Sequence, residues 1–378
     1  MNKNVLITGA SGFIGTHLIR FLLQKNYNVI AVTRQAGKKS DHPALQWVQK
    51  FEDISIRQID YVVNLAGANI GEKRWTESRK KQLIKSRVNT TRKLYVWLKQ
   101  SQIFPLIQRQ KFEGTVQLAL DAFEKKKVEK VVLSQAVEYE FNRHQEPENL
   151  LAALLKQNPN AYNFVIPVEH NNYILGASPE LLLSKQGRIV TSNPLAGSRP
   201  KSQISEKNFV SQQELNHSEK DQHEHRIVVE NIIRNLATHC VELKVSEFPD
   251  ILETSTMLHL SSEFQGVLKQ QAPDALNLAL ELHPTPAVCG SPTHVAKQFI
   301  LDHEGYDRHY YTGLVGWMDA EGNGEWVVTI RCGLLSENKM RLYAGAGIVE
   351  GSDAEAEWLE TEAKMQTMLN ILNTKVAV

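Results

Sequence analysis

The expected secondary structure changes character near residue 102, and this change argues against one continuous fold. Before it, single strands alternate with helices, which predicts a parallel sheet. After about residue 112, long helices alternate with pairs of adjacent strands, such as 162–167 with 173–176 and 313–318 with 325–332, which predicts antiparallel sheets. Pro105 marks the junction, and no long linker surrounds it. We therefore expect an α/β segment over 1–102 and an α+β domain over 103–378.

Length and charge limit the class of protein further. A chain of 378 residues can form two to three domains of about 150 residues each. Its 43 basic and 42 acidic residues leave a formal charge of +1, which gives no general attraction to nucleic acid or to an acidic membrane. No apolar stretch approaches the roughly 18 residues of a membrane span, and the first residues do not form a secretory signal. We expect a soluble, cytoplasmic monomer that acts on a small molecule.

A glycine-rich loop follows the first expected strand and opens a helix. In Thr8-Gly9-Ala10-Ser11-Gly12-Phe13-Ile14-Gly15, Gly9 permits a tight turn and Gly12 lets the backbone approach a pyrophosphate. Gly15 allows close helix packing, and the anion would lie at the helix N-terminus. Arg34, just beyond the second strand, is placed to meet a 2′-phosphate. The loop therefore predicts a possible site for NADP(H).

Two further strings, Asn64-Leu65-Ala66-Gly67 and Lys73-Arg74-Trp75-Thr76, follow a later strand. With the glycine-rich loop, they resemble the extended short-chain dehydrogenase/reductase family, in its sugar-epimerase-like branch. The resemblance stops near residue 100, before the strands that carry that family's catalytic Ser and Tyr-x-x-x-Lys pair. Tyr95 and Lys99 have that spacing but come too early, and we interpret them as one face of an ordinary helix. We expect a half Rossmann segment with an unpaired sheet side, which at most binds a nucleotide weakly.

The last expected helix, over 353–373, carries Glu357, Glu360 and Lys364 at spacings of three and four residues, so these side chains share one face. A strand broken by Gly345 and Gly347 precedes the helix, and glycines there let the backbone come close to a ligand. Carboxylates beside such a strand suit Mg²⁺. A solvated helix face with an ion pair between Glu360 and Lys364 is the alternative.

Glu224 is a further candidate metal ligand, in Lys220-Asp221-Gln222-His223-Glu224-His225 at the start of a long helix. Two histidines beside a glutamate also raise the possibility of zinc. The metalloprotease spacing His-Glu-x-x-His is absent, however, and no cysteine is near in the sequence. Mg²⁺ is therefore the favoured ion.

Seven motifs follow one another along 112–372: Lys130-Val131-Val132-Leu133-Ser134, Leu175-Gly176-Ala177-Ser178-Pro179-Glu180-Leu181-Leu182, Pro194-Leu195-Ala196-Gly197-Ser198, Glu219 to His225, His283-Pro284-Thr285-Pro286-Ala287, Gly322 to Cys332, and Ala344-Gly345-Ala346-Gly347-Ile348-Val349. In this order they resemble the chorismate-utilising enzymes, most closely the isochorismate synthases of siderophore pathways. The resemblance implies an isomerase that adds water to C2 of chorismate while the C4 hydroxyl leaves.

The resemblance also implies residue roles. Lys130 would be the base that activates water, and Glu180 the acid that protonates the leaving oxygen. Lys130 begins an apolar strand and Glu180 precedes three leucines, so burial should lower the pKa of the lysine and raise the pKa of the glutamate. Glu224 and Glu360 would hold Mg²⁺, with Glu357 close by.

The same resemblance assigns the anion-binding groups. Arg331 would take the enolpyruvyl carboxylate through its planar fork, and the backbone at Gly197 and Gly345, with the Lys364 side chain, would complete the set. Lys130 favours water over ammonia as the nucleophile, and Ala196 replaces the covalent lysine of aminodeoxychorismate synthases. A salicylate synthase, which goes on to eliminate pyruvate, is the nearest alternative. Menaquinone synthesis is a second destination for the product.

Two departures from the family pattern stand out. Gln135 replaces an arginine after Val-Val-Leu-Ser. The usual N-terminal strands of the family, roughly another hundred residues, are replaced by the half Rossmann segment. We expect this replacement to reduce or abolish activity, because it leaves unpaired sheet edges. The competing interpretations are an NADP-dependent epimerase or reductase fragment and an inactive fusion product.

Overall fold

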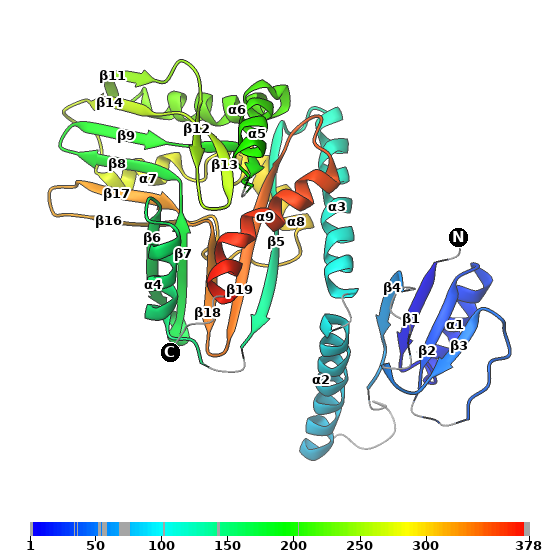
Figure 1. Cartoon of the computed structure of the whole chain (residues 1–378). Helices are drawn as coiled ribbons and strands as arrows, with labels where there is room; N and C mark the ends of the chain where they lie inside the picture. Colours follow the sequence, from blue (N-terminus) through cyan, green and yellow to red (C-terminus); the bar gives the residue numbers. More distant parts are fainter. Residues whose placement is uncertain are drawn as a thin grey trace. The chain divides into compact units, whose positions relative to one another are not determined.

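A computed structural model describes residues 3–33, 35, 37–51, 54, 59–67, 76–100, 103–141, 144–202 and 204–373. The chain divides into two compact units, residues 1–110 and 111–378 (Figure 1). Helix α3 (Ile103–Glu124) contains the point of division. No helix in these residues combines the length and the apolar character that a membrane span requires.

The N-terminal unit contains a parallel sheet, as the sequence predicts. The strand order is β3-β2-β1-β4. Its elements are β1 (Asn4–Thr8), α1 (Phe13–Gln24), β2 (Asn28–Val32), β3 (Leu45–Val48), β4 (Tyr61–Asn64) and α2 (Glu77–Gln100). Strand β3 was not predicted, because it is only four residues long and includes the polar Gln46.

Strand β1 sends successive side chains to opposite faces of the sheet. Val5 and Ile7 pack in one apolar cluster with Ile19 of α1, whereas Leu6 packs in another with Trp97 of α2. Both faces of this strand are therefore buried, as is usual in parallel sheets.

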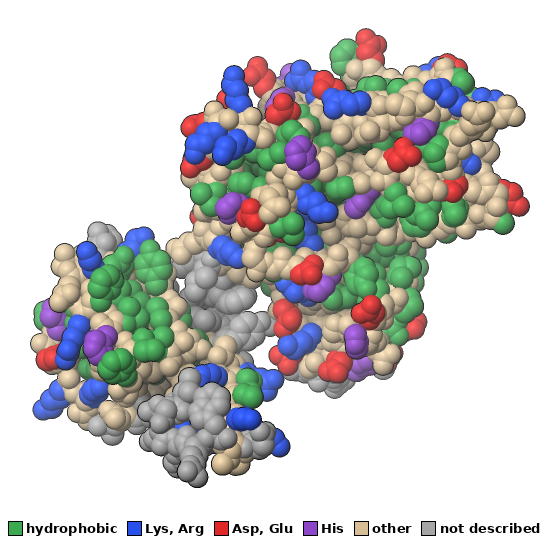
Figure 2. Space-filling view, turned by 180° about the vertical axis from the view of Figure 1, so that it is seen from behind, with side chains coloured by type: hydrophobic (Ala, Val, Ile, Leu, Met, Phe, Trp, Pro, Cys, Tyr) green, Lys and Arg blue, Asp and Glu red, His purple; other side chains and the backbone are tan. Residues whose placement is uncertain are grey.

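The surface of this unit carries exposed apolar side chains. Figure 2 shows hydrophobic groups gathered on the N-terminal unit, and the exposed ones in α1 are Phe13, Ile14 and Phe21. In the described part of the chain, the sheet ends at β3 on one side and β4 on the other. Each of these strands therefore has one side without a strand partner there.

The C-terminal unit is built from antiparallel sheets and helices. Its described residues form one six-stranded sheet in the order β15-β5-β19-β18-β7-β6, a second in the order β11-β14-β9-β8-β17-β16, and a three-stranded sheet in the order β10-β13-β12. The elements of the first sheet are β5 (Lys130–Glu140), β6 (Tyr162–Val168), β7 (Asn172–Ser178), β15 (Gly290–Ser291), β18 (Cys332–Ser336) and β19 (Lys339–Ile348). Those of the second are β8 (Leu181–Gln186), β9 (Ile189–Asn193), β11 (Cys240–Val245), β14 (Phe264–Leu268), β16 (Leu314–Met318) and β17 (Gly324–Val328).

The third sheet comprises β10 (Leu195–Pro200), β12 (Asp250–Glu253) and β13 (Met257–Ser261). The helices of this unit are α4 (Pro147–Gln157), α5 (Ser205–His217), α6 (Glu219–Leu236), α7 (Ala275–Leu282), α8 (Thr293–His303) and α9 (Ala354–Asn373), besides the end of α3. The antiparallel neighbours predicted from sequence, β6 with β7 and β16 with β17, are confirmed.

Two long strands place the functional motifs side by side. Strands β5 and β19 pair over ten residues, so that Gly345 lies opposite Ser134 and Gly347 opposite Val132. Met365 of α9 packs in an apolar cluster with Leu342 of β19. Helix α9 is thereby fixed against the strand that carries the two glycines.

Helix α6 is anchored at both ends. The Ser218 hydroxyl accepts a hydrogen bond from the Asp221 amide and caps its N-terminus. Further along, Val228 and Ile232 are buried in the apolar cluster that also holds Leu278 of α7. This anchoring fixes the first turns of α6, where Lys220 and Glu224 lie.

Candidate active site

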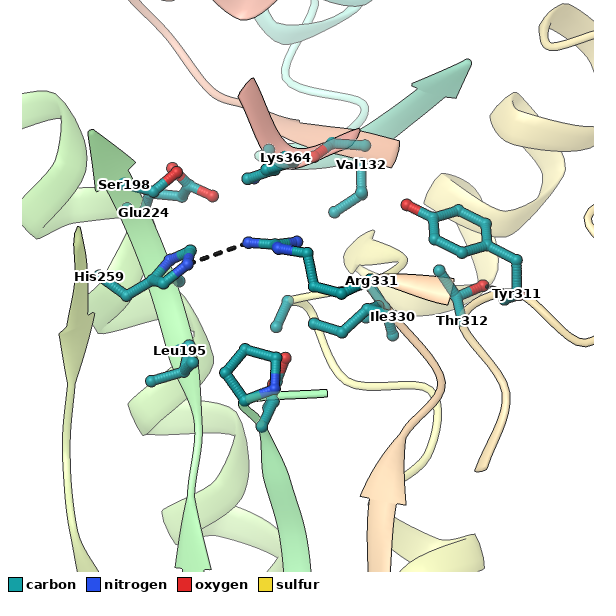
Figure 3. Close-up of a pocket in the computed structure, with 18 residues that line it drawn as sticks. Val132, Leu195, Ser198, Glu224, His259, Tyr311, Thr312, Ile330, Arg331 and Lys364 are labelled. Carbon is teal, nitrogen blue, oxygen red and sulfur yellow. Dashed lines mark hydrogen bonds between the residues drawn. The ribbon is translucent and has the colours of Figure 1, made fainter. Parts of the chain in front are cut away.

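A pocket in the C-terminal unit collects most of the residues singled out in the sequence (Figure 3). Six of them line it: Glu180, Gly197, Glu224, Arg331, Gly345 and Lys364. Lys130 and Glu360 do not line the pocket. Each instead forms an ion pair with a residue that does, Lys130 with Glu224 and Glu360 with Lys364.

Lys130 is fully buried at the start of β5, and its Nζ lies 3.1 Å from Glu224 Oε1. Burial lowers the pKa of Lys130, and the negative charge of Glu224 only partly opposes this effect. The predicted direction of the shift is therefore reproduced. Glu224 lines the pocket, whereas Lys130 does not.

Glu180 lies between β7 and β8 and is 2% exposed. Burial raises its pKa to about 7, although a backbone hydrogen bond from Leu195 and the charges of Lys130 and Arg331 favour the anion. Within the described residues, Glu180 Oε1 has no hydrogen-bond partner. A carboxyl group in this setting can hold a proton near neutral pH and release it to a substrate.

Arg331, the residue before β18, extends into the pocket opposite His259 of β13 (Figure 3). Its Nη2 lies 2.9 Å from His259 Nε2. Burial lowers the pKa of His259 well below its ordinary value, with the Arg331 charge acting in the same direction. The neutral imidazole therefore accepts a hydrogen bond from the guanidinium and orients it.

His259 and Tyr311 are two pocket residues that the sequence analysis missed. Tyr311 is buried, and its ring stacks on Tyr343 with centroids 5.2 Å apart. Burial raises the pKa of Tyr311 far above its ordinary range, so its hydroxyl remains a hydrogen-bond donor. A single histidine in the apolar strand Met257–Ser261 was the available signal for His259, whereas Tyr311 lies in a loop without a recognisable pattern.

Gly347 explains why the strand before α9 is rich in glycine. A Cβ atom at this position would lie 1.9 Å from Glu224 Oε1 and 3.0 Å from Lys130 Cε. Any other residue would therefore displace the ion pair. Gly345 is also crowded, because a Cβ there would lie 2.8 Å from the Tyr311 hydroxyl.

The three predicted metal ligands each form an ion pair with a different lysine. Besides the pair of Glu224 with Lys130, Lys220 Nζ lies 2.7 Å from Glu357 Oε1, and Lys364 Nζ lies 2.6 Å from Glu360 Oε1.

The protonation of these carboxylates follows their surroundings. Burial and the charge of Glu360 raise the pKa of Glu357 against the effect of Lys220. Burial would also raise the pKa of Glu360, but Lys364, Lys220 and a hydrogen bond from Ser198 lower it. Glu360 is thus held more firmly as an anion than Glu357.

The donor set is chemically suited to Mg²⁺, which prefers carboxylate oxygens. Glu357 Oε2 is buried and has no hydrogen-bond partner in the described part of the chain, so it can accept a cation. With the side chains as they stand, the described residues contain no group of three acidic, histidine or cysteine side chains around one ion position. Zinc-type coordination by His223 and His225 is likewise absent, since both His225 ring nitrogens face hydrogen-bond partners, Ala196 and Ser262.

A buried ion pair fixes two parts of the pocket wall. Arg308 donates from Nε to Glu304 Oε2 at 2.8 Å, and it also donates to the backbone carbonyls of Val132 and Val288. Both valines line the pocket. Glu304 in turn accepts hydrogen bonds from the Ser134 amide and hydroxyl, each at 2.7 Å. The network joins β5 to the loop before β15.

Gln135, the departure next to Ser134, is satisfied in the structure. Its Nε2 donates a hydrogen bond to Thr361 Oγ1, and both side chains are buried. The glutamine therefore ties β5 to α9, the helix that carries Glu357 and Glu360.

The glycine-rich loop of the N-terminal unit has the close contacts its pattern predicts. Gly9 has φ +67°, and a Cβ there would lie 2.6 Å from the Leu65 carbonyl carbon. A Cβ at Gly15 would lie 2.6 Å from the Gly9 carbonyl oxygen, and Gly12 precedes α1. Arg34 and Lys73-Arg74-Trp75 lie outside the described residues, so their predicted roles are not tested.

Comparisons with known proteins agree with these features. The chorismate binding enzyme family model matches residues 54–373, and the GDP-mannose 4,6 dehydratase model matches residues 6–63. The vibriobactin-specific isochorismate synthase of Vibrio cholerae is 44% identical over 260 residues, which are 69% of this chain and 66% of that protein. Isochorismate synthase EntC of Escherichia coli is 43% identical over 72% of this chain and 71% of its own length.

Solved structures give the same result. The putative 2,3-dihydroxybenzoate-specific isochorismate synthase DhbC of Bacillus anthracis matches with a TM-score of 0.69 and 41% identity, over 71% of this chain and 72% of that one. The menaquinone-specific isochorismate synthase MenF of Escherichia coli matches with a TM-score of 0.64 and 31% identity, over 70% of this chain and 61% of that one.

The chain belongs to the chorismate binding enzymes. Its C-terminal unit carries the isochorismate synthase domain of that family, and a segment similar to GDP-mannose 4,6 dehydratase precedes it. The chain spans about two thirds of the length of the curated relatives it matches.

Proposed function

We propose that this chain converts chorismate to isochorismate, and that Lys130 and Glu180 are its base and acid. The observation that carries the proposal is the pair of opposite pKa shifts. Burial lowers the pKa of Lys130 and raises that of Glu180 to about 7, so burial favours the neutral amine in one group and the neutral carboxyl in the other. These are the states that a base and an acid need at the start of the reaction.

The reaction balances with these two groups. Lys130 takes a proton from the water whose oxygen bonds to C2, and Glu180 gives a proton to the C4 oxygen, which leaves as water. Both ring double bonds shift in the same step, from C1=C2 and C5=C6 to C1=C6 and C4=C5. Lys130 reaches this water only when its ion pair with Glu224 opens, because Glu224 lines the pocket and Lys130 does not.

Substrate binding follows from the charges around the pocket. Chorismate is a dianion, and Arg331 offers a planar fork for the enolpyruvyl carboxylate. His259, as a neutral acceptor, sets the plane of that fork. Lys364 Nζ donates to the Gly345 carbonyl at 2.9 Å, which holds its charge at the pocket wall.

Glu224, Glu357 and Glu360 are the residues proposed to hold Mg²⁺, which would neutralise the C1 carboxylate of chorismate. The unpartnered Glu357 Oε2 supports this role. We place the product in siderophore synthesis, with menaquinone synthesis as the second destination, since relatives of both kinds match. We assign at most weak NADP(H) binding at Gly9, Gly12, Gly15 and Arg34 to the N-terminal unit, without a part in this reaction.

The test is to incubate the full-length protein with chorismate and MgCl₂ and to separate chorismate, isochorismate and salicylate by chromatography. We expect isochorismate from the wild type and none from Lys130→Ala. Lys201→Ala is the matched control, because Lys201 pairs with Glu253 away from the pocket. Salicylate as the product would identify a lyase instead. No turnover by a folded wild-type sample would contradict the proposal and support the inactive fusion.

A further inference from the structure

Lys220 takes no part in the proposed reaction, yet its ammonium lies among the proposed magnesium ligands. Its Nζ is 2.7 Å from Glu357 Oε1, 3.7 Å from Asp221 Oδ1 and 3.8 Å from Glu224 Oε2. The carboxylates of these three acidic residues are almost completely buried. One positive charge is therefore shared by three buried carboxylates from two helices.

This ammonium satisfies the cluster only in part. Glu224 has a second lysine neighbour in Lys130, whereas the ion pair shown for Glu357 is with Lys220. Glu357 Oε2 is buried and, within the described residues, lacks a hydrogen-bond partner. A buried oxygen without a hydrogen-bond partner is unfavourable, so a further positive charge beside Glu357 would stabilise the cluster.

A divalent ion and this ammonium cannot share the same carboxylate oxygens, because like charges at contact distance repel strongly in a buried site. The Lys220 side chain can move away from these oxygens. Its side chain is long and flexible, and 22% of it is exposed, so it can turn toward solvent or stay with Asp221. Asp221 also pairs with Arg199 at 2.6 Å and so remains neutralised in either case.

We infer that Lys220 is a placeholder cation, which neutralises Glu357 and Glu224 in the metal-free protein and leaves them when Mg²⁺ binds. This inference rests on the magnesium site of the proposed function. It makes Lys220 a positioning residue, which keeps the ligand side chains inside the unit before the ion arrives. It also means that Mg²⁺ must displace a bound charge and is held less tightly as a result.

Lys220→Met tests the inference, because methionine keeps much of the apolar stem and removes the charge. Without Mg²⁺ the variant should unfold at a lower temperature than the wild type, since Glu357 loses its counter-ion. With saturating MgCl₂ this difference should disappear. Isothermal titration with MgCl₂, without chorismate, should show binding at least tenfold tighter than to the wild type. Lys201→Met, which removes a 2.8 Å ion pair with Glu253, should leave Mg²⁺ affinity unchanged.

Two results would overturn the inference while leaving the magnesium site in place. An equal loss of unfolding temperature with and without Mg²⁺ would make Lys220 a purely structural residue. Weaker Mg²⁺ binding by the variant would show that Lys220 supports the bound ion. If Lys220→Met does not fold, a crystal structure of the wild type grown with MgCl₂ decides the question by whether Nζ still contacts Glu357.

The magnesium assignment and the isomerase activity fail in distinguishable ways. A wild-type protein that gives no heat and no thermal shift with MgCl₂ would overturn the inference together with the magnesium site. A wild-type protein that binds Mg²⁺ but forms no isochorismate would overturn the proposed reaction, and the Lys220→Met titration would still decide the role of Lys220.

Discussion

Replacing Glu180 by glutamine should stabilise the protein at high pH and remove its activity. The pKa of Glu180 is raised from 4.5 to about 7 because the side chain is buried. In free energy this difference is roughly 3 kcal/mol, at about 1.4 kcal/mol for each pKa unit. Burial favours the neutral carboxyl group over the carboxylate at this position. Glutamine is neutral at every pH and therefore resembles the protonated glutamate.

The sign of the pH dependence follows from proton binding. Between pH 4.5 and about 7, the folded protein binds the Glu180 proton more tightly than the unfolded chain does. The contribution of Glu180 to the free energy of unfolding is therefore greatest below pH 4.5, and it is lost as the pH rises to about 7. Glu180→Gln lacks this loss, so at pH 8 it should be more stable than the wild type by roughly 3 kcal/mol.

Denaturant titrations of both proteins at pH 5 and pH 8 measure this effect, and the change in their difference isolates Glu180 from other titrating groups. Glu206→Gln, at an exposed position in α5, is the control and should show no such change. Isochorismate formation should fall about 10²- to 10⁴-fold in Glu180→Gln. If the variant and the wild type show the same pH dependence of stability, burial does not raise the pKa of Glu180 as argued. Unchanged turnover would refute the role of Glu180 as the acid.

Two further substitutions probe the neighbouring charges. Arg331→Lys should raise KM for chorismate at least tenfold in steady-state kinetics, because an ammonium cannot replace a planar two-point contact; an unchanged KM would place the carboxylate elsewhere. Glu224→Gln should lower the free energy of unfolding by about 3–5 kcal/mol in denaturant titrations, since Lys130 is left buried without its counter-ion. Adding Lys130→Met to this variant should recover much of the lost free energy of unfolding. If Glu224→Gln alone is as stable as the wild type, the ion pair contributes nothing to stability.

Local patterns predicted part of the fold, whereas most of the pocket residues came from the family resemblance. Helix α9 and the antiparallel strand pairs follow from periodicity and short turns, and the parallel sheet follows from alternating strands and helices. Glu180 and Arg331 were identified through the family resemblance of the motifs that contain them. Their presence in one pocket could be expected from the family resemblance but not from sequence spacing, since about half of the unit separates them.

The residues that were missed act through contacts between distant segments. His259 matters because its Nε2 faces Arg331, and Lys220 because it reaches Glu357 on another helix. Neither contact produces a periodic pattern in the sequence from which it could be predicted. Lys220 stands beside Asp221 and four residues before Glu224, which sequence analysis interprets as ordinary helix charges. Whether the three acidic residues form a metal site in the loaded enzyme stays a prediction.

The hydrogen bonds from Arg308 to Val132 and Val288 bear on how such a pocket can diversify. Both wall residues are held by their backbone carbonyls, and their side chains take no part in that attachment. Exchange of either valine for a larger or smaller residue would therefore alter the contour presented to a ligand while the wall itself keeps its position. Ligand selectivity can therefore change through a single substitution at either valine. A substitution at Arg308, in contrast, would disturb both wall segments at once.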